Sequence, residues 1–321
     1  MPLLSRKRLI LAETETTYGT DPTPTESSNA ILVRNVEVTP LEVETVNREL
    51  VRPFLGQADQ LLASERVLIN FEVELAGSGT AGTAPAYGPL LEACRCTETV
   101  VTDTSVTYAP NSDATPSSVT IYFNNDGVLH KATGCRGTFT LNCEVGQIPF
   151  IAFEMTGIYS APSDVAISGP TYSNQAAPLV FKNGNTSSFS VFSYSGALQS
   201  LSFELANEVI YRELVGGTKG VEITDRAPSG ECMIEAVAIA TKDFFTAATG
   251  TSTGNLTFQH GSSAGNIATF TAAQIDLGGP SYSDEDGIQM LTLPYIATPT
   301  SAGNNDFSLA LDANPNFFST L

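Results

Sequence analysis

The sequence has no tryptophan and few charged side chains, since Asp, Glu, Lys and Arg make up only 15% of its 321 residues. It lacks any apolar run approaching the ~20 residues that a membrane-spanning helix requires. A secretory leader is not expected, because the apolar run Leu9–Ala12 behind Arg6-Lys7-Arg8 is too short. The histidines His130 and His260 lie in no sequence signature for catalysis. These absences argue against a membrane protein, a secreted protein and an enzyme.

Positive charge is also scarce, with 15 Lys and Arg against 34 Asp and Glu and a formal net charge of −19. Gripping nucleic acid through its phosphates needs clustered basic side chains, so that function is disfavoured. The acidity serves either solubility alone or a surface that stays near DNA without holding it.

The cysteines and the acidic turn give no sign of a metal or cofactor. The 5 cysteines are odd in number, and Cys94-x-Cys96 lacks both CxxC spacing and nearby histidines. Asp284–Gly287 lacks the ligand spacing of a calcium loop. We therefore expect reduced thiols in a cytosolic setting, with no metal and no cofactor.

Threonine, serine, glycine and proline are plentiful, which favours a mainly β protein with many turns. In Arg66–Ala76 and Arg136–Glu144, apolar side chains occupy every second position. The polar positions between them are Asn70, Glu72 and Glu74 in the first segment and Thr138, Thr140, Asn142 and Glu144 in the second. A period of two puts each set on one face of a sheet, so we expect β-sandwiches with one wet sheet surface.

A short motif occurs twice, as VNRELV at Val46–Val51 and IYRELV at Ile210–Val215. Each copy precedes a loop, an apolar strand and a short helical segment, which is Ala84–Cys94 or Asp243–Ala248. Agreement in order, spacing and element type predicts a diverged tandem duplication. The fold class expected is therefore mainly β, with two tandem β-sandwich domains, each with a short flanking helix and a long inter-strand loop.

The predicted boundaries are an N-terminal arm at 1–30, a first β-domain at 31–162, a linker at 163–185, a second β-domain at 186–312 and a C-terminal tail at 313–321. The loop of the first domain, Arg52–Glu65, is too long for a tight hairpin turn. It carries the apolar residues Phe54, Leu55, Leu61 and Leu62. A loop exposed to solvent would not keep these side chains, so we expect it to pack on another subunit.

Several motifs resemble those of the major tail tube proteins of long, flexible-tailed bacteriophages. They are Phe71–Leu91 (FEVELAGSGTAGTAPAYGPLL), Glu15–Pro22 (ETTYGTDP) leading to Ile31-Leu32-Val33, Gly134–Thr138 (GCRGT) and Gly146–Pro149 (GQIP). The resemblance covers most of residues 10–160 and is fainter in the second half.

This resemblance implies a β-sandwich flanked by a helix, and rings of subunits stacked into a tube that carries DNA into the host. It also implies that the long loop reaches the adjacent ring, and that tape-measure and tail-terminator proteins are partners. The chain would be part of the virion tail and assembled in the host cytoplasm. Because a single tube domain needs only the first half, two domains per chain predict a pseudo-hexameric ring of three chains. The alternative is a ring of six chains with the second half outside the wall.

Two groups of site residues follow from these expectations. The polar faces of the alternating strands should line an acidic channel through which DNA passes without specific binding. Arg48-Glu49 and its repeat Arg212-Glu213 should lie at equivalent places in domain interfaces. The alternative function is an extracellular or surface β-sandwich adhesin or assembly protein, which shares the composition but would call for a signal peptide and paired cysteines.

Overall fold

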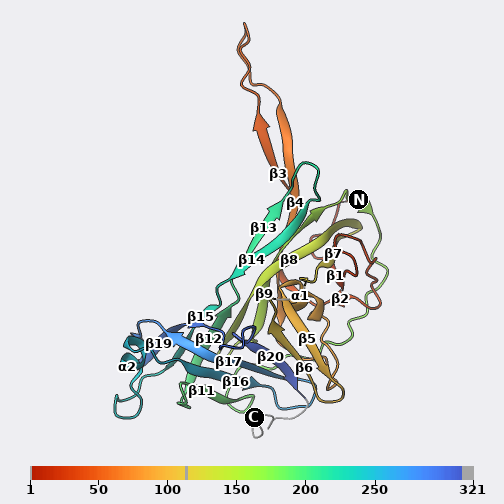
Figure 1. Ribbon diagram of the computed structural model, residues 1–321. Coiled ribbons are helices and arrows are strands. Elements are labelled where there is room, and N and C mark those ends of the chain that lie inside the picture. The colour runs from red at the N-terminus through yellow and green to blue at the C-terminus, as the bar shows by residue number, and fades with distance from the viewer. Residues whose placement is uncertain (1, 113–114, 313–321) are drawn as a thin grey trace.

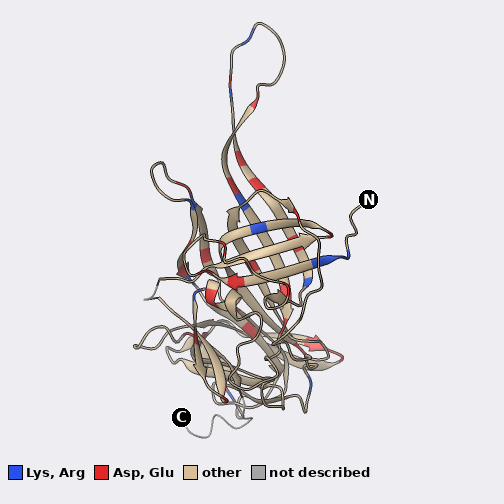
Figure 2. Cartoon of the chain, turned by 90° about the vertical axis from the view of Figure 1, so that its right-hand side faces the viewer, with Lys and Arg blue, Asp and Glu red and all other residues tan. Residues whose placement is uncertain are grey.

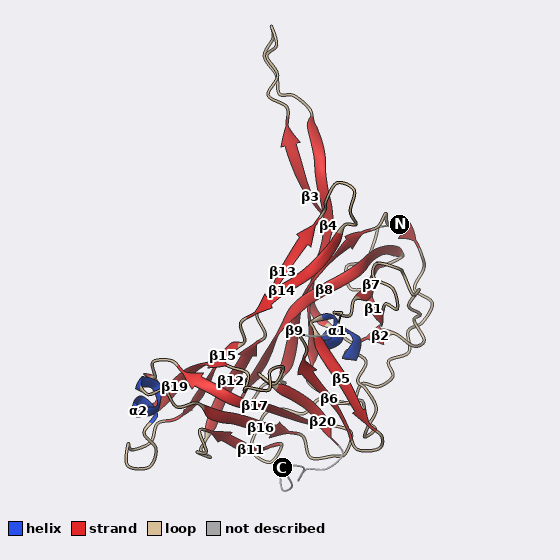
Figure 3. Cartoon of the chain, in the orientation of Figure 1, coloured by secondary structure: helices blue, strands red, loops and turns tan. Residues whose placement is uncertain are grey.

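The computed structural model describes residues 2–112 and 115–312, and antiparallel β-strands dominate it (Figure 1, Figure 3). The first half contains β1 (Arg8–Thr14), β2 (Ala30–Ile31), β3 (Arg34–Asn47), β4 (Gln60–Glu74), α1 (Gly88–Ala93), β5 (Cys96–Val101), β6 (Ser105–Pro110), β7 (Val119–Asn125), β8 (Val128–Glu144), β9 (Phe150–Tyr159) and β10 (Ser163–Asp164). The second half contains β11 (Thr186–Val191), β12 (Leu198–Glu204), β13 (Asn207–Arg212), β14 (Gly220–Arg226), β15 (Ser229–Glu235), α2 (Phe244–Thr249), β16 (Gly254–His260), β17 (Ile267–Leu277), β18 (Ser281–Glu285), β19 (Ile288–Ala297) and β20 (Ser308–Asp312). The mainly β fold class is confirmed. Neither helix, nor any other in the described ranges, is long and apolar enough to cross a membrane.

One antiparallel surface, which we call the central sheet, runs through both halves of the chain. Its strand order is β3-β4-β9-β8-β12-β15-β19-β18. The halves meet where β12 pairs with the end of β8, with Phe203 opposite Leu141. The second half therefore continues the sheet of the first.

The two halves repeat one pairing scheme. In the first half β1 pairs with β7, β7 with β8 and β8 with β9, and in the second β11 pairs with β16, β16 with β17 and β17 with β19. The four-stranded parts β3-β4-β9-β8 and β12-β15-β19-β18 also correspond. The long β8 is then matched by two strands of the second half, by β17 where it pairs with β7 and by β18 at its other end. Helix α1 follows β4 as α2 follows β15. This agrees with the order of elements in the sequence repeat.

The core lies behind the apolar face of the central sheet. Val67 and Phe71 of β4 are almost fully buried, as the alternation of their strand predicts. Phe139 of the first half contacts Phe203 and Phe307 of the second, with ring centroids 6.3 and 6.0 Å apart. The core is continuous across the halves, so the boundaries of two separate domains stay a prediction.

The N-terminal arm expected at residues 1–30 is wrong for residues 8–14, which form a strand of the fold. Leu9–Ala12 form the middle of β1 and are buried on both faces of that strand. A continuous apolar run is what a strand covered on both faces needs, and β1 pairs with β2 and β7. In the expected linker at 163–185, residues 163–164 form β10 against β8. The expected C-terminal tail at 313–321 lies outside the described residues.

Strands β3 and β4 continue past the rest of the molecule as a long hairpin, Leu41–Arg66, which we call the arm (Figure 1). The connection between the strands is shorter than expected, because β3 ends at Asn47 and β4 begins at Gln60. Leu61 and Leu62 therefore lie on β4 and not in a loop. An isolated hairpin buries neither face, so its apolar and polar residues need not alternate. The sequence pattern therefore did not predict that β3 and β4 extend this far.

Candidate functional site

One face of the central sheet is polar and open to solvent. Directly paired residues point to the same side of a sheet, and Asn70 lies opposite Glu154, which lies opposite Thr138. The same registers place all the polar residues expected from the alternation on this face, namely Asn70, Glu72, Glu74, Thr138, Thr140, Asn142 and Glu144. We call this surface the polar face.

The second half extends the polar face, which the sequence analysis missed. Ser202 lies opposite Asn142 and is itself opposite Glu231, while Glu204 lies opposite Thr140. The signal was present in the sequence, because these residues alternate with the buried Leu201, Phe203 and Cys232. The alternation was hard to recognise because β12 and β15 are short, with 7 residues each.

Carboxylates dominate the charge of the polar face. Its glutamates include Glu37, Glu72, Glu74, Glu144, Glu154, Glu204, Glu231, Glu235 and Glu285. Arg34 pairs with Glu72 at 2.7 Å, so this cation adds no net positive charge. A groove of about 670 Å³, lined by residues that include Glu144, Glu231 and Glu285, follows the junction of the two halves. Figure 2, which views the molecule from the side of β1, β7 and α1, shows acidic segments along the arm and in both halves of the chain. The polar face is therefore negative in both halves.

Two hairpin ends carry exposed apolar side chains. In the arm, Phe54 and Leu55 are 64% and 103% exposed, and Leu61 and Leu62 are also exposed. The second hairpin, β13–β14, corresponds to the arm, and its end lies beside the base of the arm (Figure 1). The expected stacking residues are thus available for contact with another molecule.

The repeated dipeptides occupy equivalent positions in the two hairpins. Arg48-Glu49 directly follows the end of β3, and Arg212-Glu213 lies at the end of β13. Arg48 pairs with Asp59 across the arm at 3.2 Å. The role expected for both dipeptides in interfaces between domains stays a prediction.

The central sheet has two open edges in the part of the chain that the structure describes. Strand β3 pairs on one side with β4, and β18 pairs on one side with β19. Every residue of β18 is exposed, including Tyr282, whose ring packs 5.6 Å from that of Phe245 on the core side. Open edges of this kind invite pairing with another chain.

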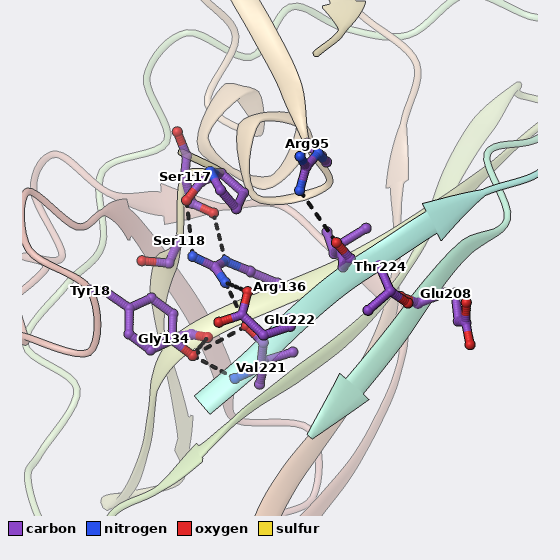
Figure 4. A network of polar contacts seen from close by, with 12 residues as sticks. Tyr18, Arg95, Ser117, Ser118, Gly134, Arg136, Glu208, Val221, Glu222 and Thr224 are labelled. Atoms are coloured by element: carbon purple, nitrogen blue, oxygen red, sulfur yellow. Dashed lines mark hydrogen bonds and ion pairs between the residues drawn. The ribbon is translucent and has the colours of Figure 1, made fainter. Parts of the chain in front are cut away.

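The motifs Glu15–Pro22 and Gly134–Thr138, which are distant in the sequence, meet in one polar network. Figure 4 shows the part of this network around Tyr18, Gly134 and Arg136. The buried carboxylate of Glu15 accepts hydrogen bonds from the Ser118 hydroxyl at 2.6 Å and from the amide N–H groups of Gly134 and Gly19, each at 2.7 Å. This fastens Glu15, which belongs to the N-terminal arm expected at 1–30, onto β7 and β8.

Arg136 fixes the second hairpin to the same network. Its guanidinium donates to the carbonyl of Val221 at 2.6 Å, pairs with Glu222 at 2.8 Å and lies 4.5 Å from the Tyr18 ring (Figure 4). The Tyr18 hydroxyl accepts from the Val221 amide at 2.6 Å. Burial raises the pKa of Tyr18, so its hydroxyl stays neutral. The first half thus holds β14 in place.

We expect Arg136→Met to lower the free energy of unfolding by about 2–3 kcal/mol, because it leaves the carbonyls of Pro116, Ser117 and Val221 without this donor. Glu222→Gln is the matched control and should cost less than about 1 kcal/mol, since Glu222 is half exposed. Urea unfolding of both variants measures the difference. Equal stabilities would contradict this role of Arg136.

Neither a metal-binding cluster nor a reactive thiol is found among the described residues. They contain no group of three or more His, Cys, Asp or Glu side chains placed to hold a metal ion. The cysteines are free and buried, and burial raises the pKa of Cys96 and of Cys232 to about 12. Such thiols are poor nucleophiles. The features that stand out are the polar face, the open edges and the apolar hairpin ends.

Comparison with protein-family models matches residues 5–297 to a family described as phage tail tube protein. The match spans both halves, including the second half in which the motifs are fainter. A search of the curated proteins found no match.

Proposed function

Because the chain belongs to the phage tail tube protein family, we propose that three copies close into a ring and that these rings stack into a tube for DNA. Membership makes the chain a structural protein of the virion tail that assembles with itself, and not an enzyme. The three-chain ring, the stacking and the passage of DNA are the parts that we propose.

The proposed ring is supported mainly by the way in which the two halves of the chain join. There β12, the first strand of one four-stranded part, pairs with β8, the last strand of the other. If the halves are equivalent, the open edge of β18 pairs in the same antiparallel way with β3 of the next chain. Three chains then supply six four-stranded parts, and the ring closes with pseudo-sixfold symmetry.

The open edge of β18 exposes an apolar side chain that is buried at the corresponding place of the junction between the halves. Leu141 on β8 pairs with Ile151 and is 1% exposed, because the second half covers it. Tyr282 on β18 pairs with Leu291 in the corresponding place but is 51% exposed. A neighbouring chain on this edge would bury Tyr282 and pair the free backbone groups of β18.

The competing ring of six chains, with the second half outside the wall, has less support. Strands β12 and β15 continue both the central sheet and its polar face. A decoration hung outside the wall would not share the inner sheet. We therefore assign both halves to the wall.

The polar face is proposed as the channel lining. Its glutamates would repel the phosphates of DNA, which then passes without specific binding. Tape-measure and tail-terminator proteins are the further partners that we propose for this tube. Assembly in the host cytoplasm fits the free, buried cysteines, since a reducing compartment keeps thiols unpaired.

We expect Tyr282→Asp to give folded monomers that form neither rings nor tubes, because ring closure would bury the new carboxylate. The isolated chain should lose little stability, since Tyr282 is half exposed and the change removes only its ring contact with Phe245. Native mass spectrometry of unaltered rings should count three chains. Rings of six chains, or normal tubes from the variant, would defeat the three-chain ring.

A further inference from the structure

The end of the β13–β14 hairpin exposes two large apolar side chains that the described chain leaves uncovered. Leu214 is 56% and Val215 is 109% exposed. They close the second copy of the repeated motif, and their counterparts Leu50 and Val51 in the arm are 47% and 104% exposed. Both hairpins point to the same end of the molecule (Figure 1).

The hairpin is held rigidly in this position. Asn207 through Arg212 pair with Gly220 through Arg226 along the ribbon. The Arg136–Glu222 pair ties the turn-side part of β14 to β8, and Lys219 beside the turn pairs with Glu65 of the arm at 3.2 Å. The exposure of Leu214 and Val215 is therefore a property of a braced element and not of a loose loop.

A groove of about 490 Å³ separates this hairpin end from the arm. Ala63 and Arg66 line it from the arm, and Tyr211 and Leu214 line it from the second hairpin. The Tyr211 hydroxyl is buried and has no hydrogen-bond partner among residues 2–112 and 115–312. Burial also raises the pKa of Tyr211 to about 12, so the hydroxyl is neutral and able to donate. A partner that enters the groove and brings an acceptor would satisfy it.

The opposite end of the chain carries matching apolar residues. Val145 lies in the turn between β8 and β9, and Ile288 begins β19 just after the β18–β19 turn, at the corresponding place in the second half. They are 41% and 55% exposed. These turns lie away from the arm, because β4 runs from the arm to Glu74, which pairs with Phe150 beside the first turn. Translation along a tube axis would bring such turns toward the hairpin ends of another copy.

We propose that Leu214, Val215 and the groove beside them form a second ring-to-ring contact, occupied by the β8–β9 and β18–β19 turns of a second copy of this chain. The proposal rests on the proposed tube. In a wall of alternating halves, each half faces the adjacent ring. The arm belongs only to the first half, so by itself it would leave every second half-chain around the ring without a stacking contact. The second copy of the repeated motif, at the end of the β13–β14 hairpin, supplies that contact.

The test is the double variant Leu214→Ser/Val215→Ser. We expect rings of unchanged mass in native mass spectrometry, while the critical concentration for tube formation rises at least about tenfold. Ile296→Ser is the matched control, because Ile296 is 51% exposed on the polar face and should leave both measurements unchanged. Val145→Asp/Ile288→Asp, on the other side of the contact, should likewise raise the critical concentration for tube formation and leave the rings intact.

Tyr211→Phe separates contact at the groove from a general effect on the hairpin. It should weaken tubes several-fold and leave rings and the melting temperature unchanged, because it removes only the unpaired hydroxyl. Tubes of normal critical concentration from the Leu214 and Val215 variant would overturn the second contact and leave the proposed function standing. Loss of rings together with tubes would also overturn it, by placing the hairpin within the ring. If the unaltered chain forms no tubes, the proposed function fails first and this contact with it.

Discussion

Deleting Gln57–Leu62 from the arm is expected to leave soluble rings or monomers that no longer form tubes. The deletion removes Leu61 and Leu62 and shortens the end that carries Phe54 and Leu55, all of which are exposed in the isolated chain. Burying one such side chain contributes ~1.5–3 kcal/mol, and the contacts multiply around a ring. Stacking should therefore fail at concentrations where the unaltered chain polymerises. Electron microscopy and sedimentation measure the outcome.

A gentler variant shows whether apolar contact, and not the length of the arm, is responsible. Phe54→Ser/Leu55→Ser keeps the hairpin intact and should also abolish or strongly reduce tubes. Its melting temperature should match that of the unaltered chain, because neither residue contributes to the buried core. Normal tubes from either arm variant would reject the role of the arm in stacking.

Reversing charge on the polar face is expected to turn a channel that repels DNA into one that retains it. In Glu204→Lys/Glu231→Lys, two exposed carboxylates near the junction of the halves become cations in every chain of every ring. Duplex DNA carries about one charge per ~1.7 Å of its length, so such a lining makes many phosphate contacts. Short DNA duplexes should sediment with these tubes at low salt and be released at high salt. Phage that carry the variant should eject DNA poorly.

The matched control makes the same change of charge elsewhere. Glu13→Lys/Asp164→Lys alters β1 and β10, which pair with β7 and β8 and are not among the eight strands of the central sheet. Tubes of this variant should retain much less DNA than the Glu204 and Glu231 variant does. Glu204→Gln/Glu231→Gln should fall between the two, because it removes repulsion without adding attraction. Equal retention by both lysine variants would show that the polar face does not line the channel.

The sequence by itself determined the local features of this protein. Strict alternation in Arg66–Ala76 and Arg136–Glu144 fixed which side chains are buried and which form the polar face, because successive residues of a strand point to opposite sides. The repeated motif marked the ends of two corresponding hairpins, and the helix after Pro85 formed close to where it was predicted. These features depend on neighbours a few residues apart, so a single sequence contains them.

Only the tertiary structure decided how these pieces join. The pairing of β12 with β8 merges the halves into one sheet and one core, although the strands lie far apart in the chain. The burial of Leu9–Ala12 and the fastening of Glu15 likewise depend on β7 and β8, more than 100 residues away. Strand pairing is made by backbone groups that every residue carries, so side-chain patterns identify a strand but not its partner. Which strands lie beside one another is therefore decided only in the folded molecule. The same holds for the two strand edges that stay open for another chain.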